Sequence, residues 1–348
     1  MSNNELKKKI VKWAKEYKFS NVGFTDIDLS IEEERLKDWL NNKFHGDMHY
    51  MEKHGEKRTK PELLTPGTLS IISFSANYLD FNTENPIKVL QTKDKAYISR
   101  YALGQDYHFI MKDKLKKIAQ LINQHTDSFK YRTFVDSAPV MEKPIAEKAG
   151  LGWIGKHTNL INRDNGSWFF IGEIYSNIRF DIDKKEDNFC GSCSNCISAC
   201  PTNAIVAPYK LDARKCISYL TIENKGVIPI KYRKQIGNRI FGCDDCQLVC
   251  PWNKFAKKTN ISSFNSNKGL DNISLLELFS WSEKKFKKET ESSPINRINY
   301  NQWLRNIAIG LGNSNKSKEI ILSLERKKNE ISDLNVIEHI DWAIEQQT

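Results

Sequence analysis

The chain of 348 residues is long enough for two or three domains, and its hydrophobic fraction of 39% suits a soluble globular protein. No apolar run approaches the roughly 20 residues of a membrane-spanning helix, which excludes an integral membrane protein. The formal net charge of +10 at pH 7 favours a polyanionic partner such as a nucleic acid, and a solvated, lysine-rich surface explains it equally well.

The first part of the chain, residues 1–180, predicts an α+β domain. Apolar residues recur at helical spacing in four segments and follow a strand pattern in four others. The predicted helices span 4–18, 31–42, 107–124 and 141–149, and the predicted strands span 21–25, 68–78, 131–135 and 168–175. The first helix is amphipathic and lacks the apolar core of a signal peptide, so we expect a cytoplasmic protein with reduced cysteines.

A polar, charged stretch at 181–188 precedes a segment that holds all eight cysteines of the chain. They form two runs, each closed by a cysteine before proline, with one isolated cysteine between the runs: Cys190, Cys193, Cys196 and Cys200; Cys216; Cys243, Cys246 and Cys250. This spacing predicts two [4Fe–4S] clusters, because each cluster needs four thiolates. Zinc prefers paired C-x2-C motifs with a longer gap, and disulfides need an oxidising compartment.

The ligand sets follow from the proline rule of two-cluster ferredoxins, in which the cysteine before proline ligates the cluster of the other run. The rule predicts one set made of Cys190, Cys193, Cys196 and Cys250. The other set is then Cys200, Cys216, Cys243 and Cys246. Cys216 departs from the ferredoxin pattern because it lies far upstream of its partners.

The last part of the chain, residues 261–348, is charged and predicts a small helical region. Apolar residues recur at a spacing of three to four in four short segments, at 275–279, 303–311, 320–324 and 336–344. Paired helices of this kind are typical of a HEAT-like helical repeat. Two roles remain open for it, a curved surface that holds RNA and a packing cap on the cysteine segment.

Asp136 stands where a predicted strand passes into a turn, a place that commonly carries catalytic or ligand contacts. It could donate a proton if burial raised its pKa. From the residues alone, a helix N-cap or an Asx-turn is the stronger interpretation.

Four other motifs carry weaker signals. Gly150, Gly152 and Gly155 follow a helix instead of a strand, so a dinucleotide-binding loop is not predicted. His45, His49 and His54 are spaced by four and five residues and do not complete a known metal-ligand set. Arg58 suits an anion contact. The segment 100–108 is a candidate cofactor-facing loop, with buried core aromatics as the alternative.

Four segments together resemble the bacterial epoxyqueuosine reductases: VDSAPVMEKPIAEKAGLGWIGKHTNLI, FCGSCSNCISACPTNAI, CISYLTIE and FGCDDCQLVCPWN. The resemblance extends from the N-terminus to about Asn313, and the tail beyond it is short and poorly matched. It implies a nitroreductase-like cobalamin-binding domain (1–180), a ferredoxin-like domain with two [4Fe–4S] clusters (181–260) and a C-terminal helical region (261–348).

The resemblance also implies an activity, the reduction of epoxyqueuosine to queuosine at the wobble position of tRNA anticodons. Electrons would pass through the two clusters to cobalamin, and Asp136 would be the proton donor, which requires it to be neutral. The residues implied to line the cobalamin are Arg58, Tyr97, Asp136, Thr158, Asn159, Leu160, Ser218, Leu220 and Thr221. The implied partners are tRNA and an external electron donor such as flavodoxin or ferredoxin, and we expect a monomer that does not bind membranes.

Three alternatives share part of this pattern. One is a cytoplasmic, cobalamin-dependent reductase of a small molecule, similar to the reductive dehalogenases. Another is a non-catalytic electron carrier of the ferredoxin type, for which the first 180 residues would be superfluous. The third is an iron–sulfur protein that binds RNA without catalysis. Cobalt content and activity on tRNA separate these possibilities.

Overall fold

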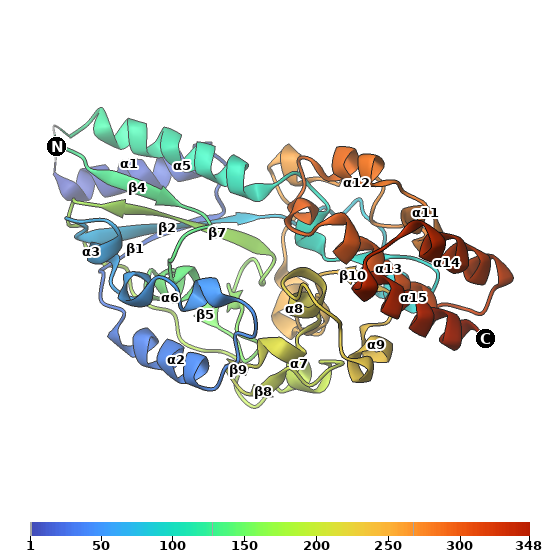
Figure 1. Cartoon of the computed structure of the whole chain (residues 1–348). Coiled ribbons are helices and arrows are strands. Elements are labelled where there is room, and N and C mark those ends of the chain that lie inside the picture. The colour runs from blue at the N-terminus through green and yellow to red at the C-terminus, as the bar shows by residue number, and fades with distance from the viewer. Residues whose placement is uncertain (1, 127, 267) are drawn as a thin grey trace.

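The computed structural model describes residues 2–126, 128–266 and 268–348. The first part of the chain is built on a four-stranded antiparallel sheet with strand order β1-β2-β7-β4 (Figure 1). The strands are β1 (Asn21–Thr25), β2 (Ser70–Asn77), β7 (Phe169–Ser176) and β4 (Tyr131–Phe134). The long strands β2 and β7 lie in the middle, and nearly all of their residues, apolar and polar, are buried because both faces of the sheet are covered.

Helices cover both faces of this sheet (Figure 1). On one face, α1 (Asn3–Glu16) and α5 (Tyr107–Asn123) pack through Ile10 and Leu115 onto Phe74. On the other face, α6 (Glu142–Lys148) packs through Ile145 onto Ile71. Side chains of a strand alternate between its two faces, which explains why neighbouring residues of β2 belong to different cores.

Shorter elements link these layers. The helices among them are α2 (Ser30–Asn41), α3 (Pro61–Leu64) and α4 (Pro86–Gln91), with single 3-10 turns at His49–Met51, Gly55–Arg58 and Arg100–Ala102. The strands are β3 (Tyr97–Ile98), β5 (Trp153–Ile154) and β6 (Leu160–Ile161), and β5 pairs with β6. The predicted long helices and strands of this part agree with the structure to within two residues at each end.

The cysteine segment is made of short elements and turns. It contains α7 (Asn195–Ser198), β8 (Ile205–Ala207), β9 (Lys210–Leu211), α8 (Ile217–Ile222), α9 (Ile230–Ile236), β10 (Arg239–Phe241) and α10 (Asp245–Leu248), with 3-10 turns at Ala213–Lys215 and Pro251–Phe255. The helices α7 and α10, which each begin inside a cysteine run, pack against one another. The two runs are therefore neighbours in space.

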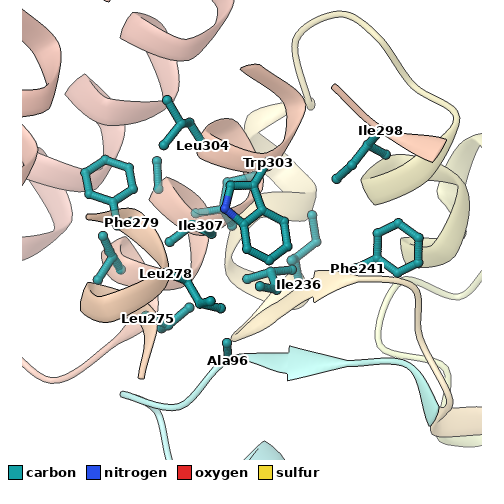
Figure 2. Packing of buried hydrophobic residues seen from close by; sticks show 14 of the residues in the cluster. Ala96, Ile236, Phe241, Leu275, Leu278, Phe279, Ile298, Trp303, Leu304 and Ile307 are labelled. Carbon is teal, nitrogen blue, oxygen red and sulfur yellow. The ribbon is translucent and has the colours of Figure 1, made fainter. Parts of the chain in front are cut away.

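The C-terminal region consists of α11 (Leu275–Phe279), α12 (Glu283–Thr290), α13 (Tyr300–Asn313), α14 (Lys318–Glu330) and α15 (Leu334–Gln347), with 3-10 turns at Ser262–Phe264 and Pro294–Arg297. Figure 2 shows Trp303 of α13 in the middle of a core shared with Ile236, Phe241 and Ala96. In addition, β3 pairs in parallel with β10. The helices thus cap the cysteine segment, and the shared core crosses the predicted limits at 180 and 260, which remain predictions.

Hydrogen bonds from two neighbouring side chains of α13 hold α8 against it. Arg305 is 1% exposed and donates hydrogen bonds to the carbonyls of Leu220 (2.9 Å), Asn224 (2.8 Å) and Gly226 (2.7 Å). Its neighbour Asn306 donates to the carbonyl of Thr221 at 2.8 Å. Buried carbonyls at a helix end need partners, so α13 supplies what α8 cannot satisfy within itself. Within the described residues, no helix is both long and apolar enough to cross a membrane.

Candidate active site and cysteine clusters

A cavity of about 480 Å³ lies between the sheet and the cysteine segment. Its walls come from β7, from the loop before β6, from the N-terminus of α8 and from the loop before α10. Five of the predicted cobalamin-contacting residues line it: Asp136, Thr158, Asn159, Leu160 and Ser218. Asp136 and Thr158 both have positive φ angles, of 52° and 67°, which is uncommon for residues other than glycine and often marks a functional site.

Four predicted contacts lie outside the lining among the residues that the structure describes. Leu220 is 1% exposed in the core behind α8, and the hydroxyl of Thr221 accepts a hydrogen bond from the backbone N–H of Gly242 at 3.0 Å. Arg58 is buried and donates to the carbonyl of Tyr50 at 3.1 Å. In this structure these three side chains contact other parts of the protein instead of lining the cavity.

Tyr97, whose contact with cobalamin stays a prediction, bonds a residue of the second cysteine run in this structure. Its hydroxyl donates a hydrogen bond of 2.8 Å to the carboxylate of Asp244, which also accepts from the hydroxyl of Ser99 at 2.5 Å and the backbone of Arg100 at 2.8 Å. Asp244 stands between Cys243 and Cys246. Tyr97 therefore braces the second cysteine run.

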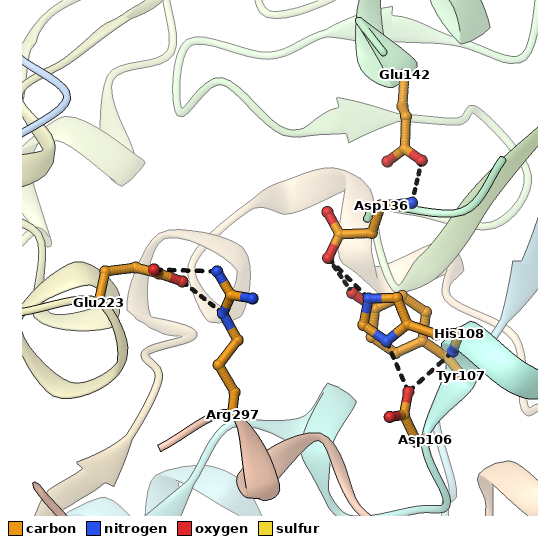
Figure 3. Close-up of polar contacts among 7 residues, drawn as sticks. All are labelled: Asp106, Tyr107, His108, Asp136, Glu142, Glu223 and Arg297. Atoms are coloured by element: carbon orange, nitrogen blue, oxygen red, sulfur yellow. Dashed lines mark hydrogen bonds and ion pairs between the residues drawn. The ribbon is translucent and has the colours of Figure 1, made fainter. Parts of the chain in front are cut away.

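The carboxylate of Asp136 points into the cavity beside the start of α5 (Figure 3). Its Oδ2 atom accepts a hydrogen bond from the hydroxyl of Tyr107 at 2.7 Å and lies 3.1 Å from Nε2 of His108. The side chain is 57% exposed because it lines an open cavity. Although burial opposes ionisation, the hydrogen bonds from His108 and Tyr107 lower the pKa of Asp136. Asp136 must therefore gain a proton before it can act as the predicted donor, and that role stays a prediction.

The proton resides on His108 instead. Its Nδ1 lies 2.6 Å from Asp106, the N-cap of α5, so the ring lies between two carboxylates (Figure 3). Burial acts against the charged ring, but hydrogen bonds to Asp106 and Asp136 raise the pKa of His108 to about 9. At neutral pH the site therefore holds an imidazolium next to an ionised Asp136.

Two further carboxyl groups lie behind Asp136. Glu142 of α6 accepts a hydrogen bond from the backbone N–H of Asp136. Burial, followed by the negative charge of Asp136, raises the pKa of Glu142 to about 8. Glu173 of β7 is fully buried, its oxygens find no partner in the described part of the chain, and burial raises its pKa well above the usual range. Burial thus favours the protonated form of both carboxyls, and Glu142 anchors the loop of Asp136.

A cation faces Asp136 from the cysteine side of the cavity (Figure 3). Arg297 forms a two-point ion pair with Glu223, at 2.8 Å from Nε and 3.1 Å from one terminal nitrogen. Its guanidinium also lies 5.8 Å from the ring of Tyr50. Because its charge favours the ionised form of Asp136, Arg297 helps to hold negative charge in this part of the site.

The eight cysteines gather in two groups of four. Cys190, Cys193, Cys196 and Cys250, here called the outer cysteines, line a separate cavity of about 40 Å³. Cys200, Cys216, Cys243 and Cys246, here called the inner cysteines, line the large cavity together with Asp136. These groups coincide with the two sets that the proline rule predicted.

The chemistry of these groups suits iron. Burial, followed by nearby negative charge, raises the pKa of Cys243 and Cys246, so crowded thiols are poorly ionised on their own. Iron supplies the positive charge that thiolate ligands need. His157, which lines both cavities, gives a second sign of a bound group. It is 3% exposed, its Nδ1 accepts from the backbone of Asn159 at 3.1 Å, and Nε2 has no partner within the described residues.

The neutral His157 ring therefore carries its proton on Nε2, a buried donor that a cofactor could satisfy. Sequence reasoning missed His157, and it noted Tyr107 and His108 only as part of a candidate loop. It also missed Glu142, which lies six residues beyond Asp136, and Arg297, which is distant from Asp136 in the sequence. Positive φ at Asp136 and Thr158 could not be read from residue types that are common in turns.

Of the three histidines near the N-terminus, only two lie close together. Ligand atoms of His45, His49 and Glu52 all lie within 4.8 Å of one another, and His54 is not in this group. His45 is buried, with Nε2 3.0 Å from Glu52. His49 and Glu52 are exposed, and the ion pair accounts for the arrangement without a metal.

Comparison with known proteins places this geometry in a family. Residues 189–253 match the family model for a 4Fe-4S double cluster binding domain, and residues 58–137 match the model described as epoxyqueuosine reductase QueG, DUF1730. The chain is 49% identical to the epoxyqueuosine reductase of Escherichia coli (strain K12), over 99% of this chain and 90% of that protein. The Pseudomonas aeruginosa enzyme is also 49% identical, over 97% of this chain and 94% of the relative.

Solved structures agree. The epoxyqueuosine reductase of Streptococcus thermophilus superimposes with a TM-score of 0.88 at 29% identity, over 98% of this chain and 90% of that one. A Bacillus subtilis structure, with its catalytic aspartate loop swung out of the active site, has a TM-score of 0.85 at 25% identity and covers all of both chains. The predicted fold class and the two [4Fe–4S] clusters are confirmed. The chain belongs to the epoxyqueuosine reductase family.

Proposed function

We propose that this chain removes the epoxide oxygen of epoxyqueuosine in the tRNA anticodon inside the large cavity, with Asp136 delivering a proton. By family it is an oxidoreductase that acts on epoxyqueuosine in tRNA, and a related structure contains an epoxyqueuosine-modified tRNA stem loop. That structure has a TM-score of 0.85 at 25% identity and covers 99% of this chain and all of the other. One observation carries the proposal, the meeting of the inner cysteines and the Asp136–His108 pair in one cavity.

The reaction converts an epoxide to an alkene. Both carbon–oxygen bonds break, the oxygen leaves as water, and the change consumes two electrons and two protons. When bound, the two [4Fe–4S] clusters and cobalamin supply single electrons and a strongly reducing cobalt. The outer and inner cysteines would hold the clusters. Family membership supports the cobalamin that the sequence implied, and Thr158, Asn159, Leu160 and Ser218 would hold it in the cavity, where His157 offers a free donor.

The chain itself handles the protons. Asp136 is ionised at rest, so it cannot donate until it receives a proton. His108 holds that proton on Nε2, 3.1 Å from Oδ2 of Asp136. As the epoxide oxygen becomes basic, the proton of His108 can move to Asp136, and Asp136 can then deliver it to that oxygen. The hydrogen bond from the Asp136 backbone to Glu142 keeps the carboxylate aimed into the cavity during this exchange.

Charge supports an RNA substrate. The net charge of +10 favours a phosphate backbone and predicts binding that weakens as salt concentration rises. A wobble nucleotide lies in a single-stranded loop, where a base can be turned out and read in a pocket. We further infer a cytoplasmic monomer that receives electrons from an external donor such as flavodoxin or ferredoxin, since the substrate is cytoplasmic tRNA.

Asp136→Asn tests the assignment of the proton donor. Asparagine has the same shape and keeps hydrogen bonds to the loop but donates no proton to an alkoxide, so turnover should fall by at least about 100-fold. Iron and cobalamin contents should stay unchanged. Ser137→Ala, in the same exposed turn, is the matched control and should remain active. An Asp136→Asn enzyme that converts the substrate at the wild-type rate would show that another group supplies the proton.

A further inference from the structure

The outer cysteines lie next to the protein surface. The residues between and beside them, Gly191, Ser192, Ser194, Asn195 and Pro251, are all exposed. Lys156 braces this loop by donating to the carbonyls of Gly191 at 2.7 Å and Cys193 at 2.8 Å. The inner cysteines instead border the cavity proposed for the substrate. An electron from outside the protein can therefore reach the cluster of the inner cysteines by way of the cluster of the outer cysteines.

The surface around the outer cysteines is aromatic. Phe189 and Trp252 line the outer cavity, and their ring centroids are 5.8 Å apart. Phe255 lies 5.8 Å from Trp252 and is 43% exposed, and Phe189 is 36% exposed. Exposed aromatic rings that cluster in this way are characteristic of contact surfaces.

Cations surround the rings. The Arg163 guanidinium lies 4.4 Å from the centroid of the Phe189 ring, and the Lys254 ammonium lies 4.8 Å from that of Phe255. Lys257 and Lys258 follow along the same exposed segment. The carboxylates nearby in the sequence, Asp164, Glu186 and Asp187, are fewer than these lysines and arginine together with Lys156. We call the three aromatic rings and Arg163, Lys254, Lys257 and Lys258 the outer patch.

The space around the outer cysteines limits the kind of electron donor that can reach them. The outer cavity of about 40 Å³ is the space between the four cysteines that would hold the cluster, so it leaves no pocket of the roughly 300 Å³ that a free flavin or nicotinamide needs. The large cavity is the proposed place of the modified nucleotide and would be covered by RNA during turnover. A donor must therefore keep its redox group in its own protein and touch the outer patch with it.

We propose that the outer patch docks a small acidic electron carrier protein of the flavodoxin type, an inference that rests on the proposed function. The apolar edge of a planar flavin matches the exposed aromatic rings, and an acidic surface matches the cations around them. Each encounter oxidises the carrier by one electron and reduces the outer cluster by one electron. Two encounters supply the two electrons that one epoxide consumes.

The test measures reduction of the clusters, not formation of queuosine. Enzyme loaded with both clusters is mixed anaerobically with the hydroquinone form of an acidic flavodoxin, and the loss of cluster absorbance is followed at low and at high salt. Lys254→Glu and Phe255→Ser alter the outer patch. Lys116→Glu, an exposed lysine of α5 outside the outer patch, makes the same charge change elsewhere. Photoreduced 5-deazariboflavin, which is small and uncharged, serves as a reductant that needs no docking.

At low salt, Lys254→Glu should slow reduction by flavodoxin by about tenfold, because surface charge mainly changes the association rate. High salt should reduce this difference. Phe255→Ser should slow the reaction at both salt concentrations, Lys116→Glu should not, and 5-deazariboflavin should reduce all variants equally. Equal flavodoxin rates in all four proteins would overturn the proposal. It would also be overturned if the patch variants changed only reduction by a ferredoxin, or weakened only the binding of an anticodon stem loop.

The readout separates this proposal from the proposed function. Patch-dependent reduction without conversion of epoxyqueuosine would support the docking surface and contradict the substrate. Conversion of epoxyqueuosine, together with reduction by flavodoxin that does not depend on the patch, would support the proposed substrate and contradict the docking surface. Unchanged iron content in Lys254→Glu and Phe255→Ser shows that the outer cysteines still hold their cluster in both variants.

Discussion

Replacing His108 with glutamine tests whether its imidazolium supplies the proton that Asp136 delivers. Hydrogen bonds to Asp106 and Asp136, working against burial, raise the pKa of His108 from 6.5 to about 9. Glutamine reaches the same partners and holds no titratable proton. In the variant the only proton available to the substrate from this pair is one bound to Asp136 itself.

The raised pKa of His108 gives an estimate of how much His108→Gln slows the reaction. At 1.36 kcal/mol per pKa unit, a rise from 6.5 to about 9 corresponds to about 3 kcal/mol. The Asp136 side chain is 57% exposed, and solvent screening of such a partner reduces the usable value to about 2 kcal/mol. An energy of about 2 kcal/mol corresponds to a factor of about 30 in rate.

The direction of the pH dependence of the rate follows from the raised pKa of His108. His108 stays protonated up to about pH 9, so the wild-type rate should be level below that pH and fall above it. In His108→Gln the proton is lost at lower pH, where Asp136 ionises. The variant should be about 30-fold slower at pH 8 and should recover as the pH falls.

The assay is a single turnover of an epoxyqueuosine-bearing stem loop by pre-reduced enzyme between pH 6 and about pH 10, at saturating RNA. His125→Gln, an exposed histidine just beyond the C-terminus of α5, is the matched control and should follow the wild-type profile. An equal loss at every pH would mean that His108 only supports the fold. An unchanged alkaline limb in His108→Gln would mean that the proton comes from elsewhere.

Three other substitutions probe the rest of the account. Cys216→Ala should lower iron from about eight to about four atoms per chain by metal analysis, and unchanged iron would contradict the inner ligand set. Glu142→Leu should slow turnover about tenfold by releasing the Asp136 loop, whereas Glu142→Gln, which can still accept the backbone hydrogen bond, should retain the rate. Arg305→Met should cost about 3 kcal/mol, seen as a lower melting temperature, because the buried carbonyl of Leu220 loses its donor and the carbonyl of Asn224 keeps only its hydrogen bond from Gln302, and an unshifted melting temperature would rule out that role.

The sequence predicted the parts of the fold that have strong local patterns. The long strands β2 and β7 and the helices α1 and α5 have the periodicity of buried elements, and the cysteine runs contain the spacing of their clusters. The short strands β3 and β10 could not be predicted in the same way. They are two and three residues long, and their pairing joins segments about 140 residues apart in the chain.

The chemistry of Asp136 was predicted only in part. Its position at a strand end could be read from the sequence, but its ionisation depends on His108, which lies 28 residues away, and on Tyr107 beside it. From the sequence, a neutral carboxyl was the condition for proton donation, with burial as one way to meet that condition. Hydrogen bonds from a cation and a phenol outweigh that burial, because a charged donor stabilises the carboxylate directly.

The implied cobalamin contacts show a similar limit. A motif such as CISYLTIE indicates that its residues are near the site, but not which side chains face it. In a short helix, neighbouring residues point in different directions, so Ser218 lines the cavity while Leu220 enters the core behind it. Tyr97 lies on the other side of the loop that carries Cys243 and supports Asp244.

The most direct test is anaerobic loading of the protein with iron, sulfide and cobalamin, followed by metal analysis and an assay on tRNA that carries epoxyqueuosine. We expect about eight irons and about one cobalt per chain, with conversion to queuosine when a one-electron reductant is added. Full iron and cobalt without conversion would contradict the proposed substrate. Full iron without cobalt would contradict the assignment of the large cavity and, with it, the role of Asp136.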